Sequence, residues 1–176
     1  MSHAPARVLL IDDHALVRDG MRMRLGLQPE LAVVGEADDG EAALAWLAHA
    51  GAERMPDLVI TDIGMRGMGG IALAAALHED YPELAVLIVS MHDNLEYVRQ
   101  AIRAGARGYV TKTISGRELA DAIVRVSAGD AVFSPRLAGF VLDAFAGAAA
   151  DSDAAGDDDL DRLTPREREV MRYIAR

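Results

Sequence analysis

The chain has 176 residues, of which 51% are hydrophobic and 26% charged, a composition that excludes a wholly disordered protein. It contains no cysteine, which excludes disulfides and thiolate chemistry, and it has no apolar run of the ~20 residues that span a membrane. Its formal net charge of −10 is unlike that of a compact nucleic-acid-binding domain, and its first residues lack a signal-peptide pattern. We therefore expect a cytoplasmic globular protein without membrane contact.

Short apolar runs alternate with helical patterns along the first 128 residues. The runs that predict strands are 8–11, 31–37, 57–61, 85–89 and 108–111. The patterns that predict helices are 15–27, 40–50, 71–81, 94–104 and 118–128. The strands are continuously apolar, which is typical of a parallel sheet covered on both faces. Five consecutive strand–helix units therefore predict an α/β fold with a doubly wound, five-stranded parallel sheet.

The pattern changes after residue 128. Residues 135–146 predict one further helix, whose apolar side chains would pack on the preceding domain or form a dimer contact. Residues 148–161 combine Ala, Asp, Gly and Ser and are typical of a flexible linker. Thr164 and Pro165 suit the N-cap and first position of a new helix. We therefore divide the chain into a domain at 1–128, a helical and then flexible acidic linker at 129–162, and the start of a second domain at 163–176.

Reactive or charged side chains stand where four predicted strands end: Asp12 with Asp13, Asp62, Ser90 and Lys112. Sites in open parallel sheets form beyond the carboxyl ends of the strands, and a strand order beginning 2-1-3 places the first and third strands side by side. Three carboxylates would then crowd one pocket, and either proton uptake or a bound cation would relieve their repulsion. Mg²⁺ is the usual cation for all-oxygen ligands beside a phosphate. Together with Lys112 and the Ser90 hydroxyl, these acids predict a phosphoryl-transfer site.

The same residues lie in motifs that resemble the receiver domains of bacterial two-component response regulators of the NarL/FixJ type. The resemblance covers about residues 7–128 and rests on the segments VLLIDDH at 8–14, GEADDG at 35–40, DLVITD at 57–62, VSMHD at 89–93 and AGARGYVTK at 104–112. Residues 163–176 resemble the first helix of a LuxR-type helix-turn-helix. The resemblance implies a flavodoxin-like (βα)5 receiver, a helical linker and a truncated helix-turn-helix.

The resemblance also implies a phospho-acceptor and a Mg²⁺ site. Asp62 would accept the phosphoryl group and bind Mg²⁺. Asp13 would bind the ion directly, whereas Asp12 would act mainly through water. Gly64 would offer its backbone carbonyl.

A switch is implied as well. Ser90 would donate a hydrogen bond to a phosphoryl oxygen, Lys112 would pair with the phosphate, and Tyr109 would turn between exposed and buried positions. The implied partners are a sensor histidine kinase and, after phosphorylation, a second copy of the chain. The output would be transcription control through DNA, by way of the part of the output domain that this chain lacks. No enzymatic activity is implied beyond the protein's own Mg²⁺-dependent phosphorylation and dephosphorylation.

The loop after Asp62 departs from the family pattern. Arg66 stands where Pro is common, Gly69 where Asp is frequent and Gly64 where Asn is usual. We hypothesise that Gly64 changes the lifetime of the aspartyl phosphate, because a side chain at this position can obstruct or orient water.

Two other classes of function fit the sequence less well. A receiver-type docking module that works without phosphorylation would be expected to lack an acidic ligand or the lysine, and this chain has both. A Mg²⁺-dependent phosphatase on a similar sheet would place a second Asp two residues after its aspartyl nucleophile. Here His14 stands two residues after Asp12, which argues against that class.

Overall fold

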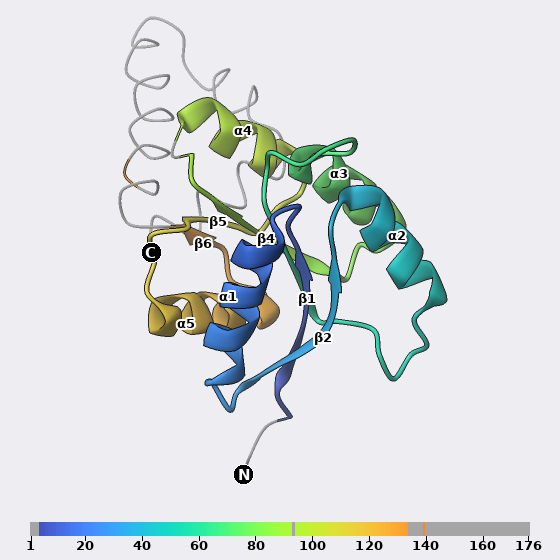
Figure 1. Cartoon of the computed structure of the whole chain (residues 1–176). Coiled ribbons are helices and arrows are strands. Elements are labelled where there is room, and N and C mark those ends of the chain that lie inside the picture. Colours follow the sequence, from blue (N-terminus) through green and yellow to red (C-terminus); the bar gives the residue numbers. More distant parts are fainter. Residues whose placement is uncertain (1–3, 93, 134–138, 140–176) are drawn as a thin grey trace, which may run out of the picture.

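The strands of the sheet form from the apolar runs of the sequence. The computed structural model describes residues 4–92, 94–133 and 139. Its strands are β1 (Ala6–Ile11), β2 (Leu31–Ala37), β3 (Leu58–Thr61), β4 (Ala85–Ser90), β5 (Gly108–Thr111) and β6 (Val132–Phe133). All neighbours pair in parallel in the order β2-β1-β3-β4-β5-β6. This order confirms the predicted doubly wound sheet and puts β1 beside β3 (Figure 1).

The helices are α1 (Ala15–Gly26), α2 (Gly40–His49), α3 (Gly70–Asp80), α4 (Leu95–Arg103) and α5 (Gly116–Ser127). Three of them begin at a residue whose side chain accepts a backbone N–H of the first turn. Asp39 accepts from Ala42, and Asn94 accepts from Glu96. Ser115 caps α5 in the same way, so this helix begins two residues earlier than the hydrophobic pattern predicts.

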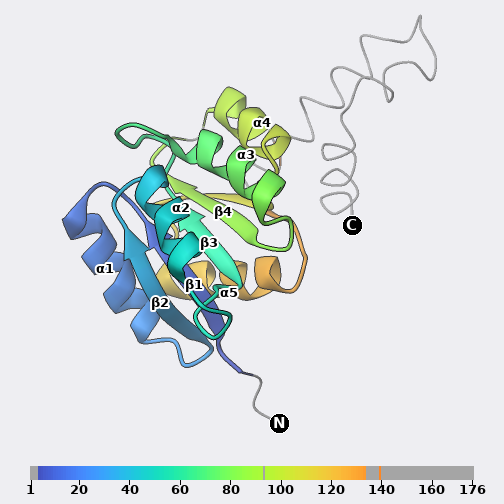
Figure 2. The ribbon, with the colours of Figure 1, turned by 90° about the vertical axis from the view of Figure 1, so that its right-hand side faces the viewer.

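The two faces of the sheet carry separate cores, because successive side chains of a strand point to opposite faces. From β1, Leu9 and Ile11 pack with α2, α3 and α4, whereas Val8 and Leu10 pack with α1 and α5. Figures 1 and 2 show these two helix layers on opposite sides of the sheet. Within the described residues, no helix is long and apolar enough to cross a membrane.

The sheet gains a sixth strand that the sequence analysis did not predict. After α5 the chain turns at Gly129, which has a φ of 101°, and Val132 and Phe133 pair with Gly108 and Tyr109 of β5. Two residues are too few to show a strand period, so the prediction of five strands was one short. The predicted elements at 135–146 (residue 139 apart), 148–161 and 163–176 lie outside the described residues.

Candidate functional site

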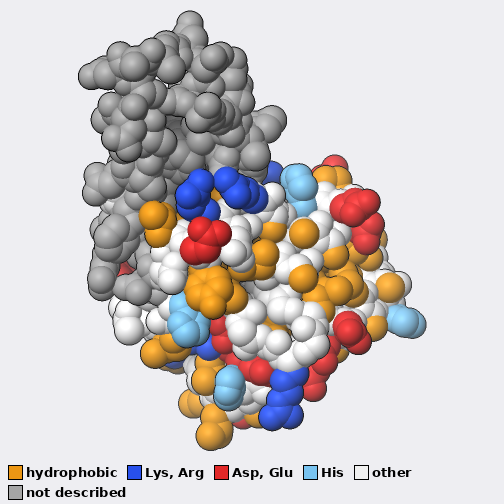
Figure 3. All heavy atoms as spheres, turned by 90° about the horizontal axis from the view of Figure 1, so that it is seen from above, with side chains coloured by type: hydrophobic (Ala, Val, Ile, Leu, Met, Phe, Trp, Pro, Cys, Tyr) orange, Lys and Arg blue, Asp and Glu red, His pale blue; other side chains and the backbone are white. Residues whose placement is uncertain are grey.

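The carboxyl ends of four neighbouring strands bring the predicted site residues to one edge of the sheet. Asp12 and Asp13 follow β1, Asp62 follows β3, Ser90 ends β4, and Lys112 follows β5. Oxygen atoms of the three aspartates and a ring nitrogen of His14 all lie within 4.8 Å of one another. Figure 3 looks onto this edge and shows acidic side chains beside histidines. We call Asp12, Asp13 and Asp62 the acid cluster.

Lys112 joins two members of the acid cluster. Its Nζ lies 2.9 Å from Asp12 Oδ2 and 2.9 Å from Asp62 Oδ2. Burial by itself would lower the pKa of Lys112, but the hydrogen bonds and charges of Asp62 and Asp12 outweigh burial and raise it above its ordinary value. The ammonium therefore stays charged throughout the neutral pH range.

The acid cluster carries more negative charge than Lys112 neutralises. Asp12 Oδ1 accepts the backbone N–H of His14 at 2.9 Å, and Asp62 Oδ1 accepts that of Ile63 at 2.7 Å. Asp13 Oδ1 lies 2.9 Å from His14 Nδ1 but is buried and accepts no hydrogen bond from the described residues. A buried carboxylate oxygen without a donor is costly unless a cation compensates it. The donor set, all hard oxygens at high charge density, therefore fits Mg²⁺.

A pocket opens beside the acid cluster. Its volume is about 350 Å³, and it is lined by His14, Val17, Asp62, Gly64, Met91, His92 and Lys112. Asp62 is only 9% exposed, so a reactant reaches its carboxylate through this pocket. Gly64 is exposed, and a Cβ atom at this position would meet no atom within 4 Å. The pocket therefore has room above Asp62 for a group of phosphoryl size.

Ser90 and Tyr109 form hydrogen bonds with the backbone of His92 and not with the acid cluster. Ser90 is fully buried, and its Oγ accepts the backbone N–H of His92 at 3.1 Å. The Tyr109 hydroxyl donates to the carbonyl of His92 at 2.7 Å, and Tyr109 is also fully buried. Neither side chain lines the pocket, whereas His92 does. No pattern in the sequence predicts this link through His92, because it joins a loop to a strand residue 17 positions away.

Sequence reasoning also missed Arg18. Its Nη1 donates to the backbone carbonyl of Asp12 at 2.6 Å, and its Nε lies 3.5 Å from Glu36 Oε1. The available clue was the helical spacing that places Arg18 one turn after His14.

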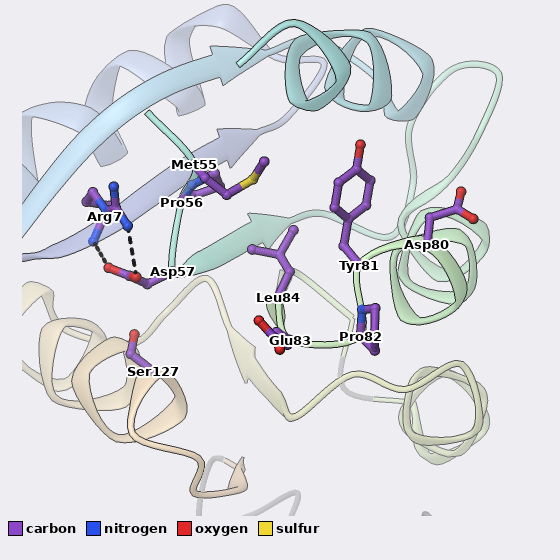
Figure 4. Close-up of a pocket in the computed structure, with 10 residues that line it drawn as sticks. All are labelled: Arg7, Met55, Pro56, Asp57, Asp80, Tyr81, Pro82, Glu83, Leu84 and Ser127. Atoms are coloured by element: carbon purple, nitrogen blue, oxygen red, sulfur yellow. Dashed lines mark hydrogen bonds and ion pairs between the residues drawn. The ribbon is translucent and has the colours of Figure 1, made fainter. Parts of the chain in front are cut away.

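A larger hollow of about 550 Å³ lies at the opposite edge of the sheet and contains none of the predicted site residues (Figure 4). It is lined by residues near the amino ends of β1, β3 and β4, among them Arg7, Asp57 and Leu84. Arg7 and Asp57 are paired there, with a backbone hydrogen bond of 2.9 Å and an ion pair of 3.5 Å. Since these charges satisfy each other, the acid cluster is the stronger candidate for chemistry.

Comparison with known proteins found a matching family model and similar relatives. A family model described as the response regulator receiver domain matches residues 8–124. The nitrate/nitrite response regulator protein NarL of Escherichia coli (strain K12) is 33% identical over 172 residues, which cover 97% of this chain and 76% of NarL.

Two solved structures are also similar. A LuxR-family two-component response regulator from Aurantimonas sp. SI85-9A1 has a TM-score of 0.71 and 36% identity over 77% of this chain and 94% of that chain. The isolated REC domain of RcsB from Salmonella enterica serovar Typhimurium, determined with the phosphomimetic BeF3⁻, has a TM-score of 0.67 and 25% identity. This match covers 76% of the present chain and 98% of the RcsB domain.

Proposed function

Because this chain belongs to the response regulator receiver family, we propose that Asp62 accepts a phosphoryl group from a sensor histidine kinase. Response regulators of the NarL and LuxR type are phosphorylated, non-catalytic regulators of transcription. The observation that carries the proposal is the position of Asp62, which lines the pocket and is paired with Lys112 at 2.9 Å.

The proposed transfer is a displacement at phosphorus. A carboxylate oxygen of Asp62 forms a bond to the phosphorus, and the bond between phosphorus and the imidazole nitrogen of the kinase breaks. The electron pair of that bond stays on the imidazole. Asp62 thereby exchanges one negative charge for a phosphoryl group that carries close to two. Lys112 already lies against Asp62, so it can balance the added charge without a large movement.

The acid cluster would hold Mg²⁺ during this transfer. Asp13 and Asp62 would bind the ion directly, Gly64 would offer its carbonyl, and Asp12 would act mainly through water. The buried Oδ1 of Asp13, which accepts no hydrogen bond from the described residues, supports a direct role for this residue. When bound, Mg²⁺ would neutralise charge on the phosphoryl oxygens.

Phosphorylation would act on the face formed by α4, β5 and α5 through Ser90 and Tyr109. The Ser90 hydroxyl would turn from the His92 N–H to a phosphoryl oxygen, and this would release the backbone N–H of His92. The Tyr109 hydroxyl donates to the carbonyl of the same residue, so Ser90 and Tyr109 are coupled through His92. The altered face would favour a homodimer, and DNA would be bound through an output domain beginning near residue 163.

Intact-mass spectrometry tests the proposal directly. After incubation with acetyl phosphate and Mg²⁺, we expect one added phosphoryl group on the wild-type chain and none on Asp62→Asn. Asp57→Asn is the matched control, because Asp57 lies at the opposite edge of the sheet and should leave labelling unchanged. An unlabelled wild-type chain, or a label that persists in Asp62→Asn, contradicts the proposal.

A further inference from the structure

Arg18 ties the turn that carries the acids to the end of β2. The backbone N–H of Asp12 donates to the carbonyl of Ala37 on β2 at 3.2 Å. The carbonyl of Asp12 accepts Arg18 Nη1 at 2.6 Å. Both backbone groups of Asp12 are therefore held, one by β2 and the other by a side chain of α1.

Glu36, near the end of β2, completes this connection. Arg18 Nε and Glu36 Oε1 lie 3.5 Å apart, and neither atom makes a hydrogen bond although both are buried. The two side chains are 20% and 26% exposed, so water screens their attraction only in part. Because the guanidinium group is planar, the ion pair with Glu36 fixes its orientation. In this orientation Nη1 reaches the Asp12 carbonyl.

The acid cluster needs such a support, since three carboxylates face a single ammonium group. Without a bound cation, this repulsion opposes the close approach of the turn after β1 to the end of β3. We propose that Arg18 is a positioning residue that holds Asp12 and Asp13 against Asp62 and thereby raises the affinity of the site for Mg²⁺. This inference rests on the Mg²⁺ site of the proposed function.

Arg18 has two opposite effects on a divalent cation, and substitutions separate them. Its positive charge disfavours the cation, whereas its hydrogen bond preorganises the ligands. Arg18→Lys keeps the charge but cannot contact the Asp12 carbonyl and Glu36 with one planar group. Arg18→Met removes both the charge and the hydrogen bond. A purely electrostatic role predicts unchanged Mg²⁺ affinity in Arg18→Lys and tighter binding in Arg18→Met.

Arg22 provides the matched control on the same helix. It pairs with Glu36 at 2.8 Å and with Asp19 at 3.2 Å, but its side chain makes no bond to the Asp12 carbonyl. Arg22→Lys and Arg22→Met therefore make the same charge changes, next to the same acid, without touching the turn that carries the acid cluster.

The test is a titration of the full chain with MgCl₂, followed by the NMR amide signals of Asp13 and Gly64. We expect Arg18→Lys to weaken Mg²⁺ binding by at least about tenfold, the usual scale for groups that orient metal ligands. Arg18→Met should also bind more weakly than the wild type. Both Arg22 variants should stay within about twofold of the wild type.

Labelling by acetyl phosphate gives a second measurement that a loss of folded protein would not reproduce. In Arg18→Lys the Mg²⁺ concentration for half-maximal labelling should rise by the same factor as the dissociation constant. The extent of labelling at saturating Mg²⁺ should equal that of the wild type.

Three results overturn the inference. Unchanged Mg²⁺ affinity in Arg18→Lys shows that the hydrogen bond to the Asp12 carbonyl does not position the ligands. An equal loss of affinity in Arg22→Lys assigns the effect to the guanidinium contacts of Glu36 and not to the Asp12 carbonyl. Loss of the far-UV circular dichroism of the native fold in Arg18→Lys makes Arg18 a residue of fold stability instead. A wild-type chain that does not bind Mg²⁺ is a different failure, because it overturns the proposed function itself.

Discussion

The ammonium of Lys112 lies 2.9 Å from the carboxylate of Asp62, although fifty residues separate them along the chain. The same Nζ is equally close to Asp12, so one cation joins the ends of β1, β3 and β5. Lys112 is also the single lysine of the sequence. Every lysine side-chain NMR signal of the protein therefore reports on this site.

Replacing Lys112 by Met keeps the length of the side chain and removes its charge. Asp12 and Asp62 then repel each other without a shared donor, in a site where all three side chains are at most 13% exposed. We expect the free energy of unfolding to fall by about 1–3 kcal/mol in urea denaturation with EDTA present. Arg117→Met is the control, since it makes the same charge change at an exposed position of α5. Equal midpoints for the wild type and Lys112→Met would contradict the expectation.

The raised pKa of Lys112 predicts a loss of stability at alkaline pH only. An unfolded lysine has an ordinary pKa of 10.5, and Asp62 and Asp12 raise the native value above this. Below pH 10.5 Lys112 is protonated in both the folded and the unfolded protein, and its ion pairs contribute fully to the free energy of unfolding. This contribution is lost as the pH rises through the pKa of Lys112 in the folded protein.

The NMR shift of ¹³C-labelled lysine, followed from about pH 9 upward, measures this pKa without ambiguity. The titration midpoint should lie above 10.5 in the native chain and near 10.5 in concentrated urea. A native midpoint at or below the unfolded one refutes the stabilising role of the two carboxylates.

Asp13→Asn should stabilise the metal-free protein while abolishing its response to Mg²⁺. The substitution removes one of three crowded negative charges at nearly constant side-chain volume. We expect the reduced repulsion to raise the free energy of unfolding by about 1 kcal/mol. In thermal denaturation, MgCl₂ should raise the Tm of the wild type but not that of Asp13→Asn. Asp19→Asn is the control, because Asp19 takes part in an exposed ion pair with Arg22 that contributes little. A Tm of Asp13→Asn that rises with MgCl₂ as in the wild type would remove Asp13 from the metal site.

Gly64→Asn tests whether this glycine sets the lifetime of the aspartyl phosphate. A Cβ atom at Gly64 meets nothing within 4 Å, so the variant should fold normally and place its amide beside the pocket. We expect a several-fold change in the decay of phosphorylated Asp62, measured by intact mass after removal of acetyl phosphate. Gly51→Asn also adds a side chain in open space, outside the pocket, and should decay as the wild type does. Equal decay rates for Gly64→Asn and the wild type would end the hypothesis.

Tyr109→Phe should weaken the fold without blocking phosphorylation. The variant loses the 2.7 Å hydrogen bond to the His92 carbonyl, at a cost of about 1 kcal/mol in urea denaturation. Labelling by acetyl phosphate should persist, because Tyr109 does not line the pocket. Tyr97→Phe is the control, since the Tyr97 ring lies near that of His92 but does not hold its carbonyl. If Tyr97→Phe lost as much stability as Tyr109→Phe, the loss could not be assigned to the hydrogen bond with the His92 carbonyl.

Local patterns predicted most of the fold. The apolar run at residues 8–11 identified β1 because a strand covered on both faces must be apolar at every position. The helical pattern at residues 40–50 predicted α2, which begins at Gly40 after the capping carboxylate of Asp39. Such features depend on residues within a few positions of one another, so the sequence displays them directly. The sixth strand escaped prediction because it is defined by pairing with β5 and not by any local period.

The composition of the acid cluster was also predictable, since parallel strands bring their carboxyl ends to one edge of the sheet regardless of the conformation of the loops. The sequence by itself thus determined that Asp12, Asp13, Asp62 and Lys112 would be neighbours. Only the tertiary structure decided how they are held: Lys112 between two carboxylates, His92 between Ser90 and Tyr109, and Arg18 on the Asp12 carbonyl. These contacts depend on the directions in which side chains leave separate helices and strands. Those directions are set only when the elements pack against one another, so no local pattern displays them.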